Sequence, residues 1–255
     1  MRAAFLHLDL SGGPEARNLA LLHKSIGLAA EQGANCIVTP EMAVQGYFFA
    51  QQETTVSIPV QPDQSLQPIR QLAIKHKLTM FLGCAEQDIA TGKYYNSCLV
   101  IGPEGSILGS HRKIRTHGVA AEAWVTAGAK LEPVACPEMK VGILICSDSY
   151  HVDNARVLKD KGAEIILVPA AWPPGEWGPG DSWERCSQIS GLPVWVCNQT
   201  GNHVALDFSQ AQSVVVVGGR TQFSYSGLQQ AVLLFDWDSS HQCAGSKQFA
   251  VVPIN

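Results

Sequence analysis

The sequence predicts an α/β sandwich in which helices cover the outer faces of one or two β-sheets. Two observations lead to this prediction: short apolar runs alternate with helical patterns, and the middle of the chain is rich in strand-like runs separated by Gly and Pro. The chain has 255 residues and 46% hydrophobic content, which is enough for a substantial core. No linker, repeat or low-complexity tract divides it, so we expect a single domain over residues 1–255.

The N-terminal part of the chain reads as strand, helix, strand. The apolar run 3–8 predicts a strand, and apolar residues at helical spacing predict a helix over 19–29. Residues 36–39 predict a second strand, which stops at Pro40 because proline cannot donate to a sheet ladder. Glu41 is therefore expected just beyond the carboxyl end of a strand.

The rest of the chain continues this alternation. The continuous apolar run 141–145 predicts a strand that ends at Cys146, and Asp153 is a suitable cap for the helix that follows. The segment 201–212 fits no single pattern. The further expected strands are 79–85, 97–101, 106–108, 164–168, 193–197, 213–217 and 231–235, and the further expected helices are 66–74, 153–161 and 182–189.

Composition excludes several functional classes. The formal charge is −4, and the 18 Lys and Arg residues are scattered, so nucleic acid is not an expected partner. No signal-like start and no apolar run of about eighteen residues is present, so we expect a cytoplasmic protein without a membrane partner. The 8 Cys and 8 His residues form no CxxC or HxxxH motif, so neither a metal nor a cofactor is expected.

Three segments place a reactive side chain at or near the end of an apolar strand. They are Thr-Pro-Glu-Met-Ala-Val-Gln-Gly-Tyr around Glu41, His-Arg-Lys-Ile around Lys113, and Gly-Ile-Leu-Ile-Cys-Ser-Asp around Cys146. Because the carboxyl ends of strands line the ligand crevice of open α/β folds, these side chains are candidates to meet. Taken singly, each residue also has a purely structural interpretation. Glu41 could be a solvent-facing carboxylate in a turn, Lys113 a solvated surface charge, and Cys146 a buried core cysteine.

Together, the three segments resemble the nitrilase superfamily of carbon–nitrogen hydrolases, in its amidase- or carbamoylase-like branch. In that family a catalytic Glu, Lys and Cys occur in this order. The resemblance implies a four-layer αββα sandwich, a small amide-like substrate, no cofactor, and a homodimer or higher homo-oligomer. The other matching positions are Tyr94–Ser97, Glu122, Trp124, Gly128, residues 162–166 and Pro169.

The resemblance also implies a role for each residue. Cys146 would be the nucleophile, and Glu41 the general base that later acts as an acid. Lys113 would favour the thiolate and, with the backbone N–H of Ser147, stabilise the oxyanion of a thioester-forming reaction. Glu122 would orient Lys113 and the substrate.

The substrate is less well defined by the sequence. Cys146 is followed by Ser and Asp, which resembles amidases and carbamoylases more than the Cys-Trp-Glu form of true nitrilases. A nitrilase and a non-catalytic binding protein on the same fold remain the alternatives. Residues 151–154 and 214–220 depart from common members of the family. The expected pocket is lined by Tyr47, Phe48, Ser147, Tyr150, His151 and Trp172.

Overall fold

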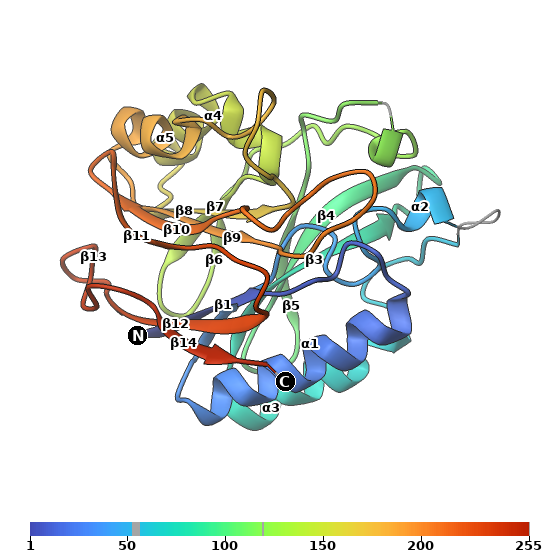
Figure 1. The fold of residues 1–255 in the computed structure, drawn as a ribbon, viewed down its shortest axis with the longest axis horizontal. Coiled ribbons are helices and arrows are strands. Elements are labelled where there is room, and N and C mark those ends of the chain that lie inside the picture. The colour runs from blue at the N-terminus through green and yellow to red at the C-terminus, as the bar shows by residue number, and fades with distance from the viewer. Residues whose placement is uncertain (53–56, 119, 255) are drawn as a thin grey trace.

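The computed structural model describes residues 1–52, 57–118 and 120–254. Its strands form two sheets that face each other, and helices cover the outer face of each sheet (Figure 1). The four layers therefore follow the order helix, sheet, sheet, helix, as predicted. Within the described ranges no helix has the length and apolar character needed to cross a bilayer.

The first sheet combines the N-terminal strands with the end of the chain. Strands β1, β2 and β3 run parallel, and β3, β4 and β5 form an antiparallel meander. The chain returns at its end to pair β12 with β1 and β14 with β12. The bounds are β1 (Arg2–His7), β2 (Cys36–Val38), β3 (Thr79–Gln87), β4 (Tyr94–Ile101), β5 (Ile107–Arg112), β12 (Ala231–Asp238), β13 (Cys243–Ala244) and β14 (Ala250–Pro253).

The second sheet has the order β11-β10-β9-β8-β7-β6. Its central strands β7, β8 and β9 are parallel and buried on both faces, which explains their continuous apolar runs. The bounds are β6 (Val134–Ala135), β7 (Lys140–Ile143), β8 (Ile165–Ala170), β9 (Val194–Asn198), β10 (Ser213–Val217) and β11 (Arg220–Tyr225).

Two pairs of longer helices form the outer layers. Helices α1 (Glu15–Glu31) and α3 (Gln67–His76) bury their apolar stripes against the first sheet, and α4 (Asp153–Asp160) and α5 (Ser182–Ser190) cover the second. The remaining elements are short: α2 (Phe49–Gln52) and the 3-10 turns η1 (Gln64–Leu66), η2 (Ala120–Glu122) and η3 (Cys146–Tyr150).

Aromatic side chains fill the space between the sheets. Phe5 of β1 and Trp195 of β9 both contact Phe235 of β12, with ring centroids 5.0 and 4.9 Å apart and the rings close to perpendicular. Such edge-to-face pairs contribute about 0.5–1.5 kcal/mol each beyond the area that they bury. This apolar layer fixes how the two sheets lie against each other.

The structure differs from the sequence prediction mainly at element boundaries. Strand β7 ends at Ile143 rather than at Ile145, and β5 continues to Arg112 instead of stopping at residue 108. Strands β6, β11, β13 and β14 were not predicted, because they are short or carry exposed residues that break the apolar pattern.

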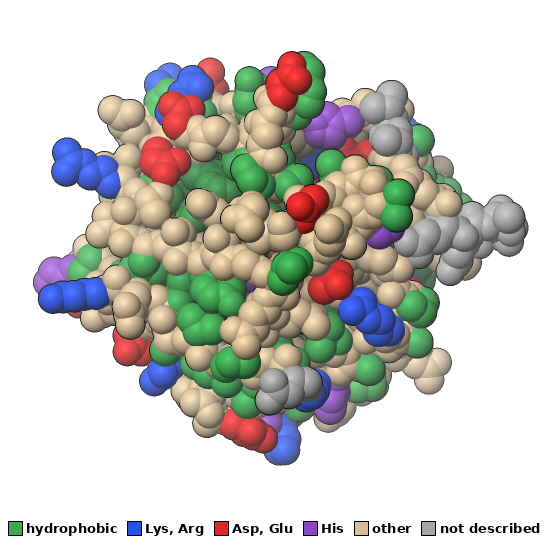
Figure 2. All heavy atoms as spheres, in the orientation of Figure 1, with side chains coloured by type: hydrophobic (Ala, Val, Ile, Leu, Met, Phe, Trp, Pro, Cys, Tyr) green, Lys and Arg blue, Asp and Glu red, His purple; other side chains and the backbone are tan. Residues whose placement is uncertain are grey.

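Among the described residues, the surface carries no cluster of basic side chains on the face shown in Figure 2, where Lys and Arg side chains stand apart from one another.

Candidate active site

The carboxyl ends of strands from both sheets meet at one edge of the sandwich. Glu41 follows β2 and Lys113 follows β5 in the first sheet, whereas Cys146 follows β7 in the second. Strand β5 is antiparallel to β4, which is antiparallel to β3, so β5 ends at the same edge as the parallel strands. Sheet topology thus brings together three residues that are far apart in the sequence.

Lys113 lies at the centre of a buried polar cluster and has no exposed surface. Its Nζ donates a hydrogen bond to Glu41 Oε1 at 2.8 Å and forms a close ion pair with Glu122. Glu122 is also buried, and its Oε2 accepts the backbone N–H of His117 at 3.0 Å. The alternative of a solvated lysine is therefore wrong.

Glu41 is held by donors from both sheets. Asn96 of β4 donates to its Oε1 at 2.8 Å, and the backbone N–H of Ala171, just after β8, donates to Oε2 at 3.0 Å. The sequence reasoning did not place Asn96 or Ala171 at the site. The Tyr-Asn-Ser match at 95–97 was the signal that pointed to Asn96.

Burial dominates the ionisation of the cluster. It raises the pKa of the Cys146 thiol well above its usual value, and Glu41 adds to this shift while Lys113 opposes it. Burial likewise raises the pKa of Glu41, against the opposing charge of Lys113. For Lys113, burial lowers the pKa, but the surrounding acidic groups outweigh it and the net shift is upward. The resting cysteine is thus a neutral thiol beside a carboxyl group that is more basic than an exposed one.

Asp148 holds the Cys146 turn against the loop that carries Lys113. Its Oδ1 accepts the backbone N–H groups of Ile114 at 3.0 Å and Arg115 at 2.7 Å. Its Oδ2 accepts the backbone N–H of Ile145 at 3.0 Å and lies 2.9 Å from His111 Nε2. The bond to Ile145 removes that N–H from the β7 ladder, which explains why the strand ends early.

The backbone at the site is strained at two positions. Met42 and Cys146 have positive φ angles of 54° and 49°, a conformation that costs a non-glycine residue about 1–2 kcal/mol. Gly83 of β3 lies directly under the turn of Glu41. A Cβ at Gly83 would overlap the Pro40 carbonyl oxygen and lie 2.9 Å from the Met42 nitrogen. Only glycine allows this close approach.

Cys146 lines a cavity of about 530 Å³, here called the Cys146 cavity. Its walls are mostly apolar and include three of the predicted pocket residues, Tyr47, Phe48 and Trp172. Glu122, the partner of Lys113, also lines it. The volume suits a small organic substrate placed against the thiol.

A second cavity of about 520 Å³ contains the other predicted pocket residues, Ser147, Tyr150 and His151. We call it the Arg115 cavity, because Arg115 lines it as well. Tyr150 and His151 therefore do not line the Cys146 cavity. The two cavities share five lining residues: His117, Trp172, Glu176, Trp177 and Gly178.

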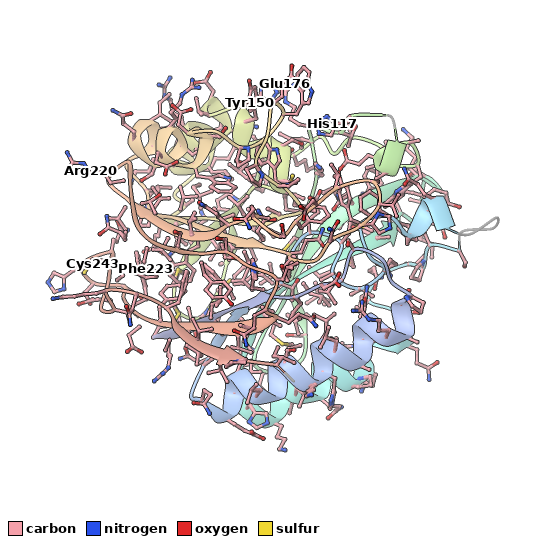
Figure 3. All side chains as sticks on the ribbon, viewed as in Figure 1. His117, Tyr150, Glu176, Arg220, Phe223 and Cys243 are labelled. Carbon is pink, nitrogen blue, oxygen red and sulfur yellow. The ribbon has the colours of Figure 1, made fainter. Side chains whose placement is uncertain are left out.

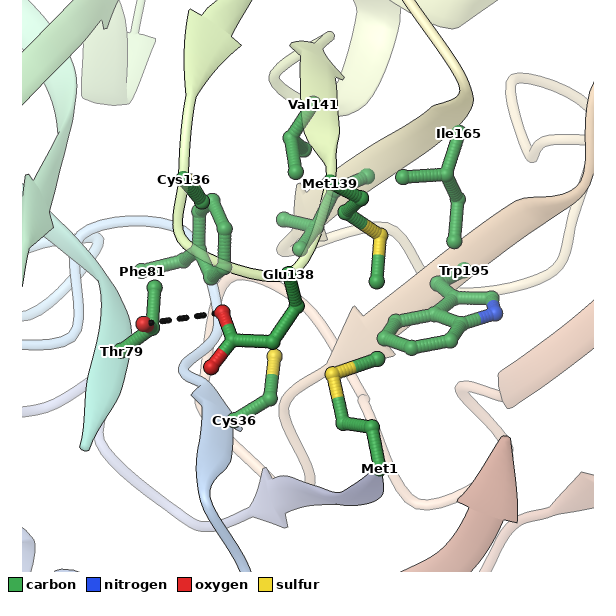
Figure 4. A pocket seen from close by; sticks show the side chains of 11 residues that line it. Met1, Cys36, Thr79, Phe81, Cys136, Glu138, Met139, Val141, Ile165 and Trp195 are labelled. Carbon is green, nitrogen blue, oxygen red and sulfur yellow. Dashed lines mark hydrogen bonds between the residues drawn. The ribbon is translucent and has the colours of Figure 1, made fainter. Parts of the chain in front are cut away.

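The opposite edge of the sandwich has a much smaller cavity. There the amino ends of the parallel strands surround a space of about 10 Å³, which is lined by Met1, Cys36 and Trp195 among others (Figure 4). Such a space holds about one water molecule. Among the described residues, no three His, Cys, Asp or Glu side chains are arranged to hold a metal ion.

Comparison with known proteins identifies the family. The sequence profile of the carbon-nitrogen hydrolases matches residues 12–223. The chain belongs to the carbon-nitrogen hydrolase family. The chain resembles a citrullinase of Francisella tularensis, with 32% identity over 72% of this chain and 69% of that protein. It also resembles an omega-amidase of Mus musculus, with 28% identity over 67% of this chain and 63% of that protein.

Solved structures show that the fold is the predicted one. An amidase from Nesterenkonia sp. superposes with a TM-score of 0.78 at 23% identity, covering 92% of this chain and 89% of the amidase. Nit3 of Saccharomyces cerevisiae, a member of the nitrilase superfamily, gives a TM-score of 0.78 at 20% identity, covering 92% and 88% of the two chains. The sequence-based assignment to the nitrilase superfamily and to a four-layer αββα sandwich is confirmed.

Proposed function

We propose that this protein hydrolyses the C–N bond of a small amide, with Cys146 as the nucleophile. One observation supports this most strongly: Lys113, fully buried, bonds to both Glu41 and Glu122, and Glu122 lines the same cavity as Cys146. A buried ammonium between two carboxyl groups beside a thiol is costly to maintain, and such perturbed clusters concentrate at functional sites.

The proposed first half-reaction forms a thioester. Because the resting thiol is neutral, its proton passes to Glu41 as the sulfur attacks the substrate carbonyl carbon. The carbonyl oxygen becomes negatively charged, and Lys113 with the backbone N–H of Ser147 stabilises it; one such donor contributes roughly 3–4 kcal/mol. Glu41 then returns the proton to the nitrogen, the C–N bond breaks, and ammonia or an amine leaves.

The second half-reaction uses water as the nucleophile. Glu41 takes a proton from water, the hydroxide adds to the thioester carbonyl, and the C–S bond breaks as the sulfur regains a proton. Glu122 orients Lys113 through both steps. A mutant of a solved amidase of this fold carries the acetamide moiety of fluoroacetamide on its active-site cysteine, which supports a nucleophilic role for the cysteine.

The test is ammonia release from simple amides and matching nitriles by the wild-type protein and a Cys146→Ala variant. We expect amides to react faster than nitriles, and turnover to be lost in the variant without loss of folding. Fluoroacetamide should add one acetamide group to the wild type, seen by intact mass, and none to the variant. Wild-type turnover in the variant would refute Cys146 as nucleophile, and faster nitrile turnover would favour the nitrilase alternative.

The citrullinase and omega-amidase relatives suggest that the substrate is a small ureido or amide compound. Homo-oligomer formation and cytoplasmic location stay predictions from the sequence. Light scattering of the purified protein measures the first, and fractionation of cells that express it measures the second.

A further inference from the structure

The Arg115 cavity contains two opposite charges that the protein itself does not pair. Arg115 and Glu176 both line it, and both residues are exposed. Across residues 1–52, 57–118 and 120–254, neither side chain has a hydrogen bond or an ion pair with another residue. By contrast, Arg112, three positions before Arg115, binds both Glu86 and Asp88. A cation and an anion are thus available to a ligand in one cavity.

The other walls of this cavity suit a small charged ligand. Tyr150 and Trp172 present aromatic rings whose centroids are 6.4 Å apart, and aromatic faces attract ammonium groups. Figure 3 shows Tyr150 and Glu176 next to each other along one edge of the molecule, with His117 beside them. The anionic side of the cavity therefore has an aromatic wall.

The Arg115 cavity also adjoins the reacting thiol. Cys146 lines one cavity and the next residue, Ser147, lines the other. Trp172, Glu176, Trp177 and Gly178 line both cavities, so the two cavities are neighbours. A ligand with its amide carbon at Cys146 and a charged end near Arg115 would pass along these shared residues. The Cys146 cavity is mostly apolar, so it suits the methylene groups between the two ends.

We propose that the Arg115 cavity binds the α-ammonium and α-carboxylate of a free amino acid whose side chain ends in the scissile amide or ureido group. This substrate class rests on the proposed hydrolase function. Arg115 binds the carboxylate, and Glu176 with the aromatic wall binds the ammonium. A substrate with one charge would leave the opposite charge of the cavity unpaired. N-acyl and N-carbamoyl amino acids lack the ammonium, so they are expected to bind less well.

The test compares matched compounds in binding and in turnover. Glutamine is compared with glutaric acid monoamide, γ-aminobutyramide and butyramide, which lack the ammonium, the carboxylate and both groups, respectively. Citrulline is compared with butylurea. Binding is measured by calorimetry with the Cys146→Ala variant, and ammonia release with the wild type. Each zwitterion should bind roughly tenfold more tightly than its neutral analogue, since two exposed charge contacts contribute about that much.

Two variants and two controls test whether the preference for the zwitterion comes from Arg115 and Glu176. Arg115→Gln and Glu176→Gln should each raise KM for the zwitterion roughly threefold, a larger factor than the change in KM for the neutral amide. Arg220→Gln and Glu31→Gln change exposed charges elsewhere and should leave the preference intact.

The outcomes separate this proposal from the function on which it rests. Equal binding of neutral and zwitterionic compounds, or an unchanged preference in both cavity variants, would overturn the amino acid site even if amides are hydrolysed. A zwitterion preference in binding without ammonia release from any amide would support the site and count against the hydrolase function alone.

Discussion

Replacing Asp148 by Asn tests whether this carboxylate holds the two halves of the site together. The fully buried side chain accepts three backbone N–H groups and contacts His111. An amide oxygen in place of Oδ1 can still accept from Ile114 and Arg115. The amide NH₂ would then face the N–H of Ile145, so that bond is lost, and the contact with His111 loses its charged acceptor. At about 1.5–3 kcal/mol for each hydrogen bond to a charged group, we expect a loss of about 3–5 kcal/mol in unfolding free energy.

Urea unfolding and ammonia-release kinetics measure the two consequences of this change. Because Asp148 positions the loop after Lys113 relative to Cys146, kcat should fall at least roughly tenfold in any population that remains folded. Asp153→Asn is the matched control, since that carboxylate is exposed and 3.6 Å from Arg156, and it should change the unfolding free energy by less than about 1 kcal/mol. A similarly small loss for Asp148→Asn, with kcat unchanged, would refute the reasoning.

Two further predictions concern packing and pH. Gly83→Ala should lower the unfolding free energy by about 1–3 kcal/mol and reduce kcat, because the added Cβ displaces the turn of Glu41. Gly27→Ala, which meets no atom within 4 Å, should instead be neutral or stabilising, and equal effects of the two in urea unfolding would contradict this. Burial lowers the pKa of His7 from 6.5 to about 4, so below pH 6.5 the unfolded chain binds a proton that the native protein does not. Between about pH 7 and pH 5 the wild type should therefore lose about 2 kcal/mol more stability than a His7→Gln variant, and parallel pH profiles would disprove this.

The strand ends that carry the reactive residues were predictable from the sequence. Continuous apolar runs mark buried strands, and Pro40 marks the end of β2 just before Glu41. The exact end of β7 was not predictable, because it depends on Asp148 accepting the N–H of Ile145 across a turn. Local apolar patterning gives no information about that bond.

Asn96 shows why part of the site was missed. In the sequence it lies within a strand-like run, and its contact with Glu41 exists only because β4 starts at the edge where the parallel strands end. The predicted pocket residues fall into two separate cavities for a similar reason, because their positions depend on tertiary structure. Tyr47 and His151 line different cavities, and the segment 176–178, which lines both cavities, could not be placed from local pattern.

Because the candidate active site is built from both sheets, activity should respond to substitutions in the aromatic layer between the sheets. Glu41 and Lys113 follow strands of one sheet and Cys146 follows a strand of the other, so the spacing between these three side chains depends on the thickness of the aromatic layer that separates the sheets. Trimming Phe5 or Trp195, far along the strands, would let one sheet shift against the other before cooperative unfolding begins. In such a variant, activity should be lost on heating at a lower temperature than secondary structure.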